Sequence, residues 1–209
     1  MRHLRVMPAS VGPDDLAPAV SALHHGGVVA FPTETFYGLA ADPRSARAIK
    51  KIFELKRRGL DQPLPLIAAS IDQVVDHVGT MTPLAERLAS RGWPGPLTLI
   101  IPASPKLCDD VHLSTGKVAV RVSADPVARA LAQSAGHAIT STSANISGDP
   151  PAATPDGVVA SLGDGIDVLI DAGPAPGALP STIVDATGDV PVLVRAGVVP
   201  WERVLEFSK

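Results

Sequence analysis

The sequence predicts an α/β (α+β) protein in which helices flank a twisted sheet of mixed parallel and antiparallel strands. Stretches with helical spacing alternate with short apolar runs through the first two thirds of the chain, and apolar runs cluster near its end. The 21 prolines and 18 glycines imply sharp turns and short connections. Because aromatic residues make up only 3% of the chain, the core must consist of Val, Leu, Ile and Ala.

Helices are expected where apolar residues recur every three to four positions. In the first of them, residues 14–25, Leu16, Ala19 and Leu23 share one face, and a Gly-Gly pair follows. In the second, residues 45–57, Ile49 forms part of the buried stripe. The other expected helices are residues 70–77, 83–91, 126–136 and 201–207.

Strands are expected at short apolar runs bounded by turn residues. The Gly- and Pro-rich stretch 172–180 is the best candidate for a linker, but too little chain follows it to form a second domain. We therefore expect a single domain spanning residues 1–209. The expected strands are residues 28–31, 64–69, 97–101, 118–122, 138–141, 168–171, 182–185 and 192–195.

Charge and composition exclude several classes of protein. The net charge is −3 with a pI near 6.0, so no overall basic excess indicates a nucleic-acid surface. The single cysteine, Cys108, excludes an internal disulfide and a Cys-rich zinc site. No apolar run approaches the roughly 18 to 20 residues of a membrane span, and residues 1–8 lack the apolar region of a secretory signal. A soluble cytoplasmic protein is expected.

A first polar cluster follows the apolar run 28–31. It contains Thr33, Thr35 and Tyr37, whose hydroxyls would face one side of an extended chain and suit a small polar ligand. The alternative is a turn in which the hydroxyls satisfy backbone groups.

A second cluster consists of Lys56 and Arg58 at the end of the second helix. Lys56 lies on the core-facing stripe, so its ammonium must reach either solvent or a cavity. Two cations that converge on a cleft would suit a triphosphate. The alternative is a solvated face, or the general preference of helix C-termini for cations.

A third cluster is the segment 141–145. Ser143 and Asn145 bracket a small alanine, so a ligand can approach the backbone, and Ser141 precedes them. Such a set can form an anion-binding nest or, alternatively, a cap or turn. Two isolated cations, Arg121 and Arg195, lie within apolar surroundings, and strand arginines are seldom buried unless they are paired.

The common catalytic motifs are missing. There is no G-x-x-x-x-G-K-[ST] loop, no G-x-G-x-x-G and no G-x-S-x-G elbow. The six histidines show no metal-ligand spacing, so no protein-bound metal is expected. Covalent catalysis therefore has no obvious nucleophile.

Taken in order and spacing, several segments resemble the threonylcarbamoyl-AMP synthase family and its YrdC/Sua5-type domain. The resemblance covers roughly residues 12–200, without the second domain of longer members. Gly59 and Ile67 depart from the family pattern, which has proline at the first position and, in some longer members, histidine at the second. The matching segments are Pro32–Leu39 (P-T-x-T-x-Y-G-L), Lys56–Arg58 (K-x-R), Trp93–Thr98 (W-P-G-P-x-T), Ala119–Val122, Ser143–Gly148 (S-x-N), Pro180–Asp185 and Val194–Gly197.

The resemblance implies a YrdC/RibB-like fold with a central concave basic cleft. It also implies an L-threonylcarbamoyladenylate synthase, which joins L-threonine, bicarbonate and ATP and releases pyrophosphate, for N6-threonylcarbamoyladenosine (t6A) modification of tRNA. Mg²⁺ would accompany ATP. The short form is expected to rely on t6A transfer-complex proteins, with possible tRNA contact and no membrane.

Residue roles follow from the same resemblance. Lys56 and Arg58 are expected to be catalytic, and Arg121 to pair with the carboxylate of threonine. The expected ATP-binding residues are Lys56, Arg58, Ser143, Asn145 and Arg195. The expected threonine-binding residues are Thr35, Arg121, Ser141 and Ser181, with Thr33 and Tyr37 lining the site.

Two other functions remain open. One is a module without catalysis that binds structured RNA on a basic concave surface, in which Lys56, Arg58, Arg121 and Arg195 contact phosphates; strong salt dependence without ATP turnover would favour it. The other is a carbamoyl-adenylate domain of the hydrogenase-maturation type, which the absence of extra zinc-finger and phosphatase domains argues against.

Overall fold

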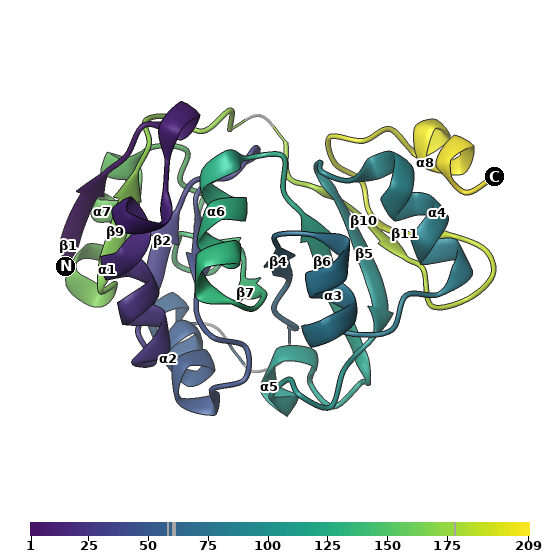
Figure 1. Ribbon diagram of the computed structural model, residues 1–209, viewed down its shortest axis with the longest axis horizontal. Helices are drawn as coiled ribbons and strands as arrows, with labels where there is room; N and C mark the ends of the chain where they lie inside the picture. Colours follow the sequence, from purple (N-terminus) through teal and green to yellow (C-terminus); the bar gives the residue numbers. More distant parts are fainter. Residues whose placement is uncertain (58, 60–61, 178) are drawn as a thin grey trace.

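The computed structural model describes residues 1–57, 59, 62–177 and 179–209. In these residues the strands divide between two sheets with helices packed around them, and the two termini lie at opposite ends of the long axis (Figure 1). The expected mixed α/β class, with parallel and antiparallel strands flanked by helices, is confirmed. The expectation of one sheet is corrected to two.

The first sheet contains the N-terminal strands. Its parallel part joins β1 and β2 to opposite sides of β9, and its antiparallel part adds β3 and β8. The order is β1 (Arg2–Arg5), β9 (Val168–Asp171), β2 (Val29–Phe31), β3 (Gly38–Ala40) and β8 (Thr142–Ser143).

The second sheet mixes both directions. β10 runs parallel to β5, and β4 runs parallel to β6, whereas β5 and β6 are antiparallel to each other. The outer pairs β10–β11 and β4–β7 are also antiparallel. The order is β11 (Val192–Arg195), β10 (Thr182–Asp185), β5 (Leu97–Pro102), β6 (Lys117–Val122), β4 (Leu66–Ala68) and β7 (Ile139–Thr140).

Helices α2, α3, α4, α6 and α7 begin after a residue whose side chain accepts from one or two of their first backbone N–H groups. Ser45 accepts from the N–H of Ala48 at the start of α2, and Asp125 accepts from two N–H groups at the start of α6. The helices are α1 (Pro13–His24), α2 (Ala46–Lys56), α3 (Ile71–His77), α4 (Pro83–Gly92), α5 (Asp109–His112), α6 (Pro126–Ala135), α7 (Pro155–Leu162) and α8 (Trp201–Phe207), with 3-10 turns at Pro8–Ser10 and Gly163–Gly165.

The core has two apolar clusters, and strand β2 contributes to both. Val29 and Phe31 pack with α1 and α6, which lie against each other, whereas Ala30 faces the cluster that includes α2 and the second sheet. Alternate side chains of a strand point to opposite faces, so β2 is buried on both. This burial explains why its sequence is continuously apolar rather than alternating.

Along the described strands the chain changes sheet between β3 and β4, between β7 and β8, and between β9 and β10, and the last two crossings position the site. β7 belongs to the second sheet and β8 to the first, so the chain changes sheet at Ser141. Residues 172–181 make the other crossing, from β9 to β10, and we call this segment the strap. The strap coincides with the linker expected from the sequence, and it contacts the rest of the molecule through hydrogen bonds such as Gly177 N–H to Thr35 O, 2.7 Å.

Candidate active site

A cavity of about 770 Å³ opens where the two sheets meet. Its wall includes residues of β3 and β8 from the first sheet and of β5, β6, β10 and β11 from the second. The volume lies in the range of small-molecule sites. Residues singled out from the sequence that line it are Thr33, Thr35, Tyr37, Arg121, Ser141, Ser143, Asn145, Ser181 and Arg195.

The two threonines after β2 share a tight turn rather than an extended strand. Thr33 Oγ1 donates to Phe36 O at 2.7 Å and accepts from the Thr35 N–H at 3.1 Å. Because the one hydroxyl proton of Thr33 is committed to Phe36, Thr35 must donate in the 3.0 Å contact between the two hydroxyls. Thr35 Oγ1 is therefore left as an acceptor at the cavity wall, while Thr33 stabilises the turn.

Tyr37 lines the cavity, but its hydroxyl is already engaged in a hydrogen bond. The hydroxyl donates to Gly173 O of the strap at 2.7 Å. Burial raises the pKa of Tyr37 to about 12, so this hydrogen-bond donor stays protonated. Tyr37 thus fastens the strap to the turn that contains Thr35.

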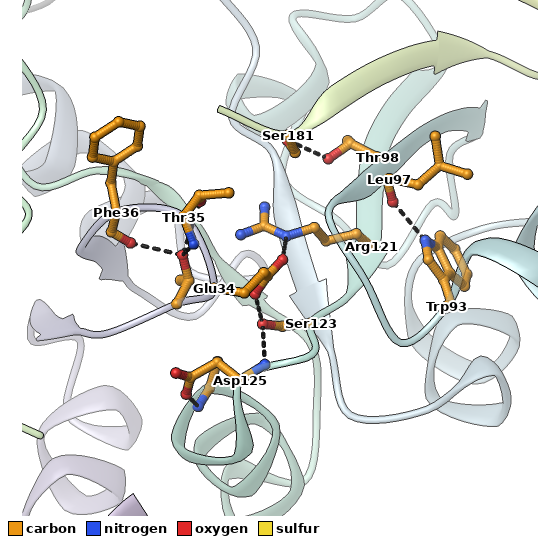
Figure 2. Close-up of polar contacts among 12 residues, drawn as sticks. Glu34, Thr35, Phe36, Trp93, Leu97, Thr98, Arg121, Ser123, Asp125 and Ser181 are labelled. Carbon is orange, nitrogen blue, oxygen red and sulfur yellow. Dashed lines mark hydrogen bonds and ion pairs between the residues drawn. The ribbon is translucent and has the colours of Figure 1, made fainter. Parts of the chain in front are cut away.

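Arg121 lies on β6 and is paired, as burial of a strand arginine requires. Its Nε donates to Glu34 Oε1 at 2.9 Å, and the Ser123 hydroxyl donates to the other carboxylate oxygen. Burial alone would raise the pKa of Glu34, but the charge of Arg121 and the hydrogen bond from Ser123 outweigh it and hold the pKa below its usual range. Figure 2 shows the guanidinium directed toward Thr35. Among the described residues its terminal nitrogens donate no hydrogen bond, and Arg121 lines the cavity.

Arg195 and Ser181 form one corner of the cavity. Arg195 Nη2 donates to both Ser181 O, at 2.8 Å, and Ser181 Oγ, at 3.0 Å. The Ser181 hydroxyl also contacts Thr98 Oγ1 at 2.9 Å (Figure 2). Arg195 is solvent-exposed as a residue, and partial desolvation of its guanidinium and the charge of Arg121 both lower its pKa.

Lys56 lies beneath the cavity rather than in its wall. Its ammonium is buried and donates to Ser143 O at 2.5 Å, to Asn145 O at 2.7 Å and to Asn145 Oδ1 at 3.3 Å. The Asn145 amide nitrogen in turn donates to Asp149 O at 2.6 Å. Lys56 therefore organises the loop that presents Ser143 and Asn145. Arg58, expected to act with Lys56, lies outside the described residues.

No role in the site was expected from the sequence for Glu34, Ser123 or Thr98, although Thr98 ends the segment that resembles W-P-G-P-x-T. Glu34 lies between the two threonines of the first cluster, and only the general need of buried arginines for a partner hinted at such a residue. Its partner is 87 positions away in the sequence, so no local pattern identifies the pair.

Comparison with known proteins now gives the family. A family model for Sua5, YciO and YrdC, described as "Telomere recombination", matches residues 21–197. The chain belongs to this family. It is 37% identical over 175 residues to threonylcarbamoyl-AMP synthase of Vibrio parahaemolyticus, and the match covers 83% of this chain and 95% of that protein.

Longer family members match over part of their length. Threonylcarbamoyl-AMP synthase of Bacillus subtilis is 38% identical over 196 residues, which cover 93% of this chain and 57% of that protein. The crystal structure of Pyrococcus abyssi Sua5 complexed with L-threonine superposes with a TM-score of 0.91 at 35% identity, covering 99% of this chain and 60% of that one. The chain thus spans a little over half the length of these two relatives.

Two further features bear on membranes and metals. Within the described ranges, no helix has the length and apolar character needed to cross a membrane. In the same part of the chain, no group of three or more His, Cys, Asp or Glu residues could hold a metal ion.

Proposed function

We propose that the chain is an L-threonylcarbamoyladenylate synthase, which forms threonylcarbamoyl-AMP and pyrophosphate from L-threonine, bicarbonate and ATP for t6A modification of tRNA. The observation that carries the proposal is the gathering of Arg121, Arg195 and several hydroxyls from both sheets around one cavity. The names of the related enzymes and the threonine complex of P. abyssi Sua5 support it.

The threonine subsite would lie between Thr35 and Arg121. The terminal guanidinium nitrogens of Arg121 suit a carboxylate, which accepts two parallel hydrogen bonds. Thr35 Oγ1, an acceptor at the wall, suits an ammonium or hydroxyl donor. Ser141 and Ser181 lie in the same wall and would complete the subsite.

The nucleotide subsite would lie toward Arg195 and the loop 143–149. Arg195 supplies a cation that no described carboxylate pairs, which suits phosphate oxygens. Ser143 and Asn145 line the cavity beside it, and Lys56 holds their backbone in place from below. Arg58 is proposed to add a further cation.

The chemistry needs no covalent enzyme intermediate. The threonine amine and bicarbonate would combine to a carbamate with loss of water, and a carbamate oxygen would then attack the α-phosphorus of ATP and expel pyrophosphate. Positioning of the reactants and stabilisation of phosphate charge by Arg195 and by backbone N–H groups would supply the catalysis.

Mg²⁺ is proposed to enter with ATP and to neutralise phosphate charge. Among the described residues, Asp149 is the carboxylate that lines the wall, and Glu34 lies behind it, paired with Arg121. This donor set fits a cation held mainly by phosphates and water. Transfer-complex proteins, tRNA contact and a cytoplasmic location belong to the same proposal.

The test is pyrophosphate release from ATP by the purified chain. We expect release to require both L-threonine and bicarbonate, and to be much weaker with L-serine. Arg195→Ala should lower kcat/KM for ATP by about 100-fold, since a lost charge-stabilising donor costs roughly 2.7 to 4 kcal/mol. Pyrophosphate release that does not depend on threonine would contradict the proposal, as would salt-sensitive RNA binding without ATP turnover.

A further inference from the structure

Arg121 and Arg195 face one cavity, but their charges are compensated to different degrees. Arg121 is 4% exposed and forms an ion pair with Glu34 at 2.9 Å. Arg195 donates only to the carbonyl and hydroxyl oxygens of Ser181 among the described residues, so it keeps its full charge. In the described part of the chain, the cavity therefore has one guanidinium paired with a carboxylate and one without a carboxylate partner.

Glu34 is itself held rigidly. The Ser123 hydroxyl donates to its second oxygen, and Ser123 Oγ accepts from the Asp125 N–H at 3.1 Å. Asp125 caps α6, and Arg129 of α6 donates to Ser123 O at 2.6 Å. Figure 2 shows this chain of contacts from Asp125 through Ser123 and Glu34 to Arg121. The orientation of the guanidinium is thus tied to a helix outside the cavity.

The ion pair with Glu34 engages only the Nε side of the Arg121 guanidinium and leaves its two terminal nitrogens available for a ligand. Glu34 occupies Nε, whereas the terminal nitrogens point toward Thr35 and the cavity. A carboxylate can accept from both terminal nitrogens. A polyphosphate binds best to a cation that has no negative group beside it. Because Glu34 places a negative charge beside Arg121, this position attracts phosphate only weakly.

We propose that Glu34 is a positioning residue that orients Arg121 for the carboxylate of the amino acid and excludes phosphate from that subsite. The inference rests on the proposed function. It adds a reason why Arg121 binds the amino acid and Arg195 binds ATP, although both guanidinium groups face one cavity. Glu34 does not serve as a base here, because both of its oxygens are engaged and its pKa is held low.

The experiment compares wild type with Glu34→Gln in the pyrophosphate-release assay, with inorganic phosphate as an added competitor. In Glu34→Gln the KM for threonine should rise by about tenfold or more, because a misoriented Arg121 guanidinium binds the threonine carboxylate poorly. The KM for ATP should stay within about threefold of the wild-type value. Phosphate should become a competitive inhibitor against threonine in the variant, with an inhibition constant about tenfold lower than in wild type, as expected for an unmasked charge. A purely structural role would not create this competition.

Two further variants keep the test decisive. Ser123→Ala releases one oxygen of Glu34 but keeps the ion pair, so it should raise the threonine KM less than Glu34→Gln does; it replaces Glu34→Gln if that variant does not fold. Glu54→Gln, at an exposed carboxylate on α2, is the matched control and should behave as wild type.

The outcomes separate the two proposals. A wild-type chain without threonine-dependent release refutes the proposed function and the role of Glu34 with it. An active wild type, together with an unchanged threonine KM and no phosphate competition in Glu34→Gln, overturns only the role of Glu34. Equal losses for ATP and threonine would also overturn it.

Discussion

At the scale of single residues, the cavity stabilises its buried charges in two ways. Arg121 pairs with the carboxylate of Glu34, and the ammonium of Lys56 donates to backbone and side-chain oxygens of Ser143 and Asn145. Uncompensated burial of either charge would cost several kcal/mol, so each partner is required by the fold. For Lys56 the partners belong to the loop 143–149, so its charge also determines the shape of that loop.

Replacing Lys56 should therefore affect stability as well as activity. In Lys56→Ala the oxygens of Ser143 and Asn145 lose a charged donor, and we expect the free energy of unfolding to fall by about 1.5 to 3 kcal/mol. Urea denaturation measures this change. Lys50→Ala, on the same helix but with a side chain 75% exposed, is the control and should change stability by less than about 0.5 kcal/mol. Equal, small effects of both variants would show that the loop does not depend on Lys56.

The Glu34–Arg121 pair predicts a pH dependence of stability. The pKa of Glu34 is lower in the folded than in the unfolded chain, so the pair stabilises the fold fully above the usual carboxyl pKa and loses this contribution as pH falls through the lowered pKa. The free energy of unfolding should thus fall less steeply below about pH 4.5 in Glu34→Gln than in wild type. Chemical denaturation at a series of pH values measures both slopes, and parallel curves would contradict the pairing.

At the scale of elements, the cavity depends on close approach between residues 180–182, where the strap enters β10, and residues 197–199, which follow β11. The Val198 N–H donates to Pro180 O at 3.0 Å, and the Thr182 hydroxyl donates to Val199 O at 2.7 Å. Gly197 makes this approach possible, because a Cβ there would lie 2.2 Å from Pro180 O. The contact fixes the position of Ser181 relative to Arg195.

Gly197→Ala should open this contact. A backbone oxygen cannot move aside as a side chain does, so we expect a loss of about 1 to 3 kcal/mol in stability, typical of overpacking. The KM for ATP should rise because Arg195 is displaced. Gly188→Ala, in the connection between β10 and β11 where no atom lies within 4 Å of the added Cβ, is the matched control. Thermal unfolding separates the two variants, and equal transition temperatures would contradict the argument.

At the scale of the whole molecule, the site is a product of long-range pairing. Local periodicity predicted six of the described helices and most strands near their observed positions, because helical spacing and apolar runs are properties of adjacent residues. Strands β1 and β3 and helices α5 and α7 were not expected. The apolar run 138–141 was expected to form a strand, and only Ile139–Thr140 does so, as β7; the chain changes sheet at Ser141, and the unexpected strand β8 follows in the first sheet. Sheet membership depends on partners distant in sequence, as does the pairing of Glu34 with Arg121, so neither could be inferred from local pattern.

Because the cavity is built from both sheets, ligands should stabilise both together. Threonine and ATP, each at 100 times its Kd, should each raise the free energy of unfolding by about 2.7 kcal/mol, since each binds only the folded chain. Hydrogen exchange should slow in β8 of the first sheet and in β10 of the second, the strands beside Ser143 and Ser181. Protection from hydrogen exchange in only one sheet would mean that the ligand occupies only the part of the cavity that this sheet forms. Arg195 and the loop 143–149 could then not bind ATP together. Arg195→Ala, which leaves the first sheet untouched, should lose the ATP-dependent protection of β8 as well as of β10 if one nucleotide bridges the two sheets.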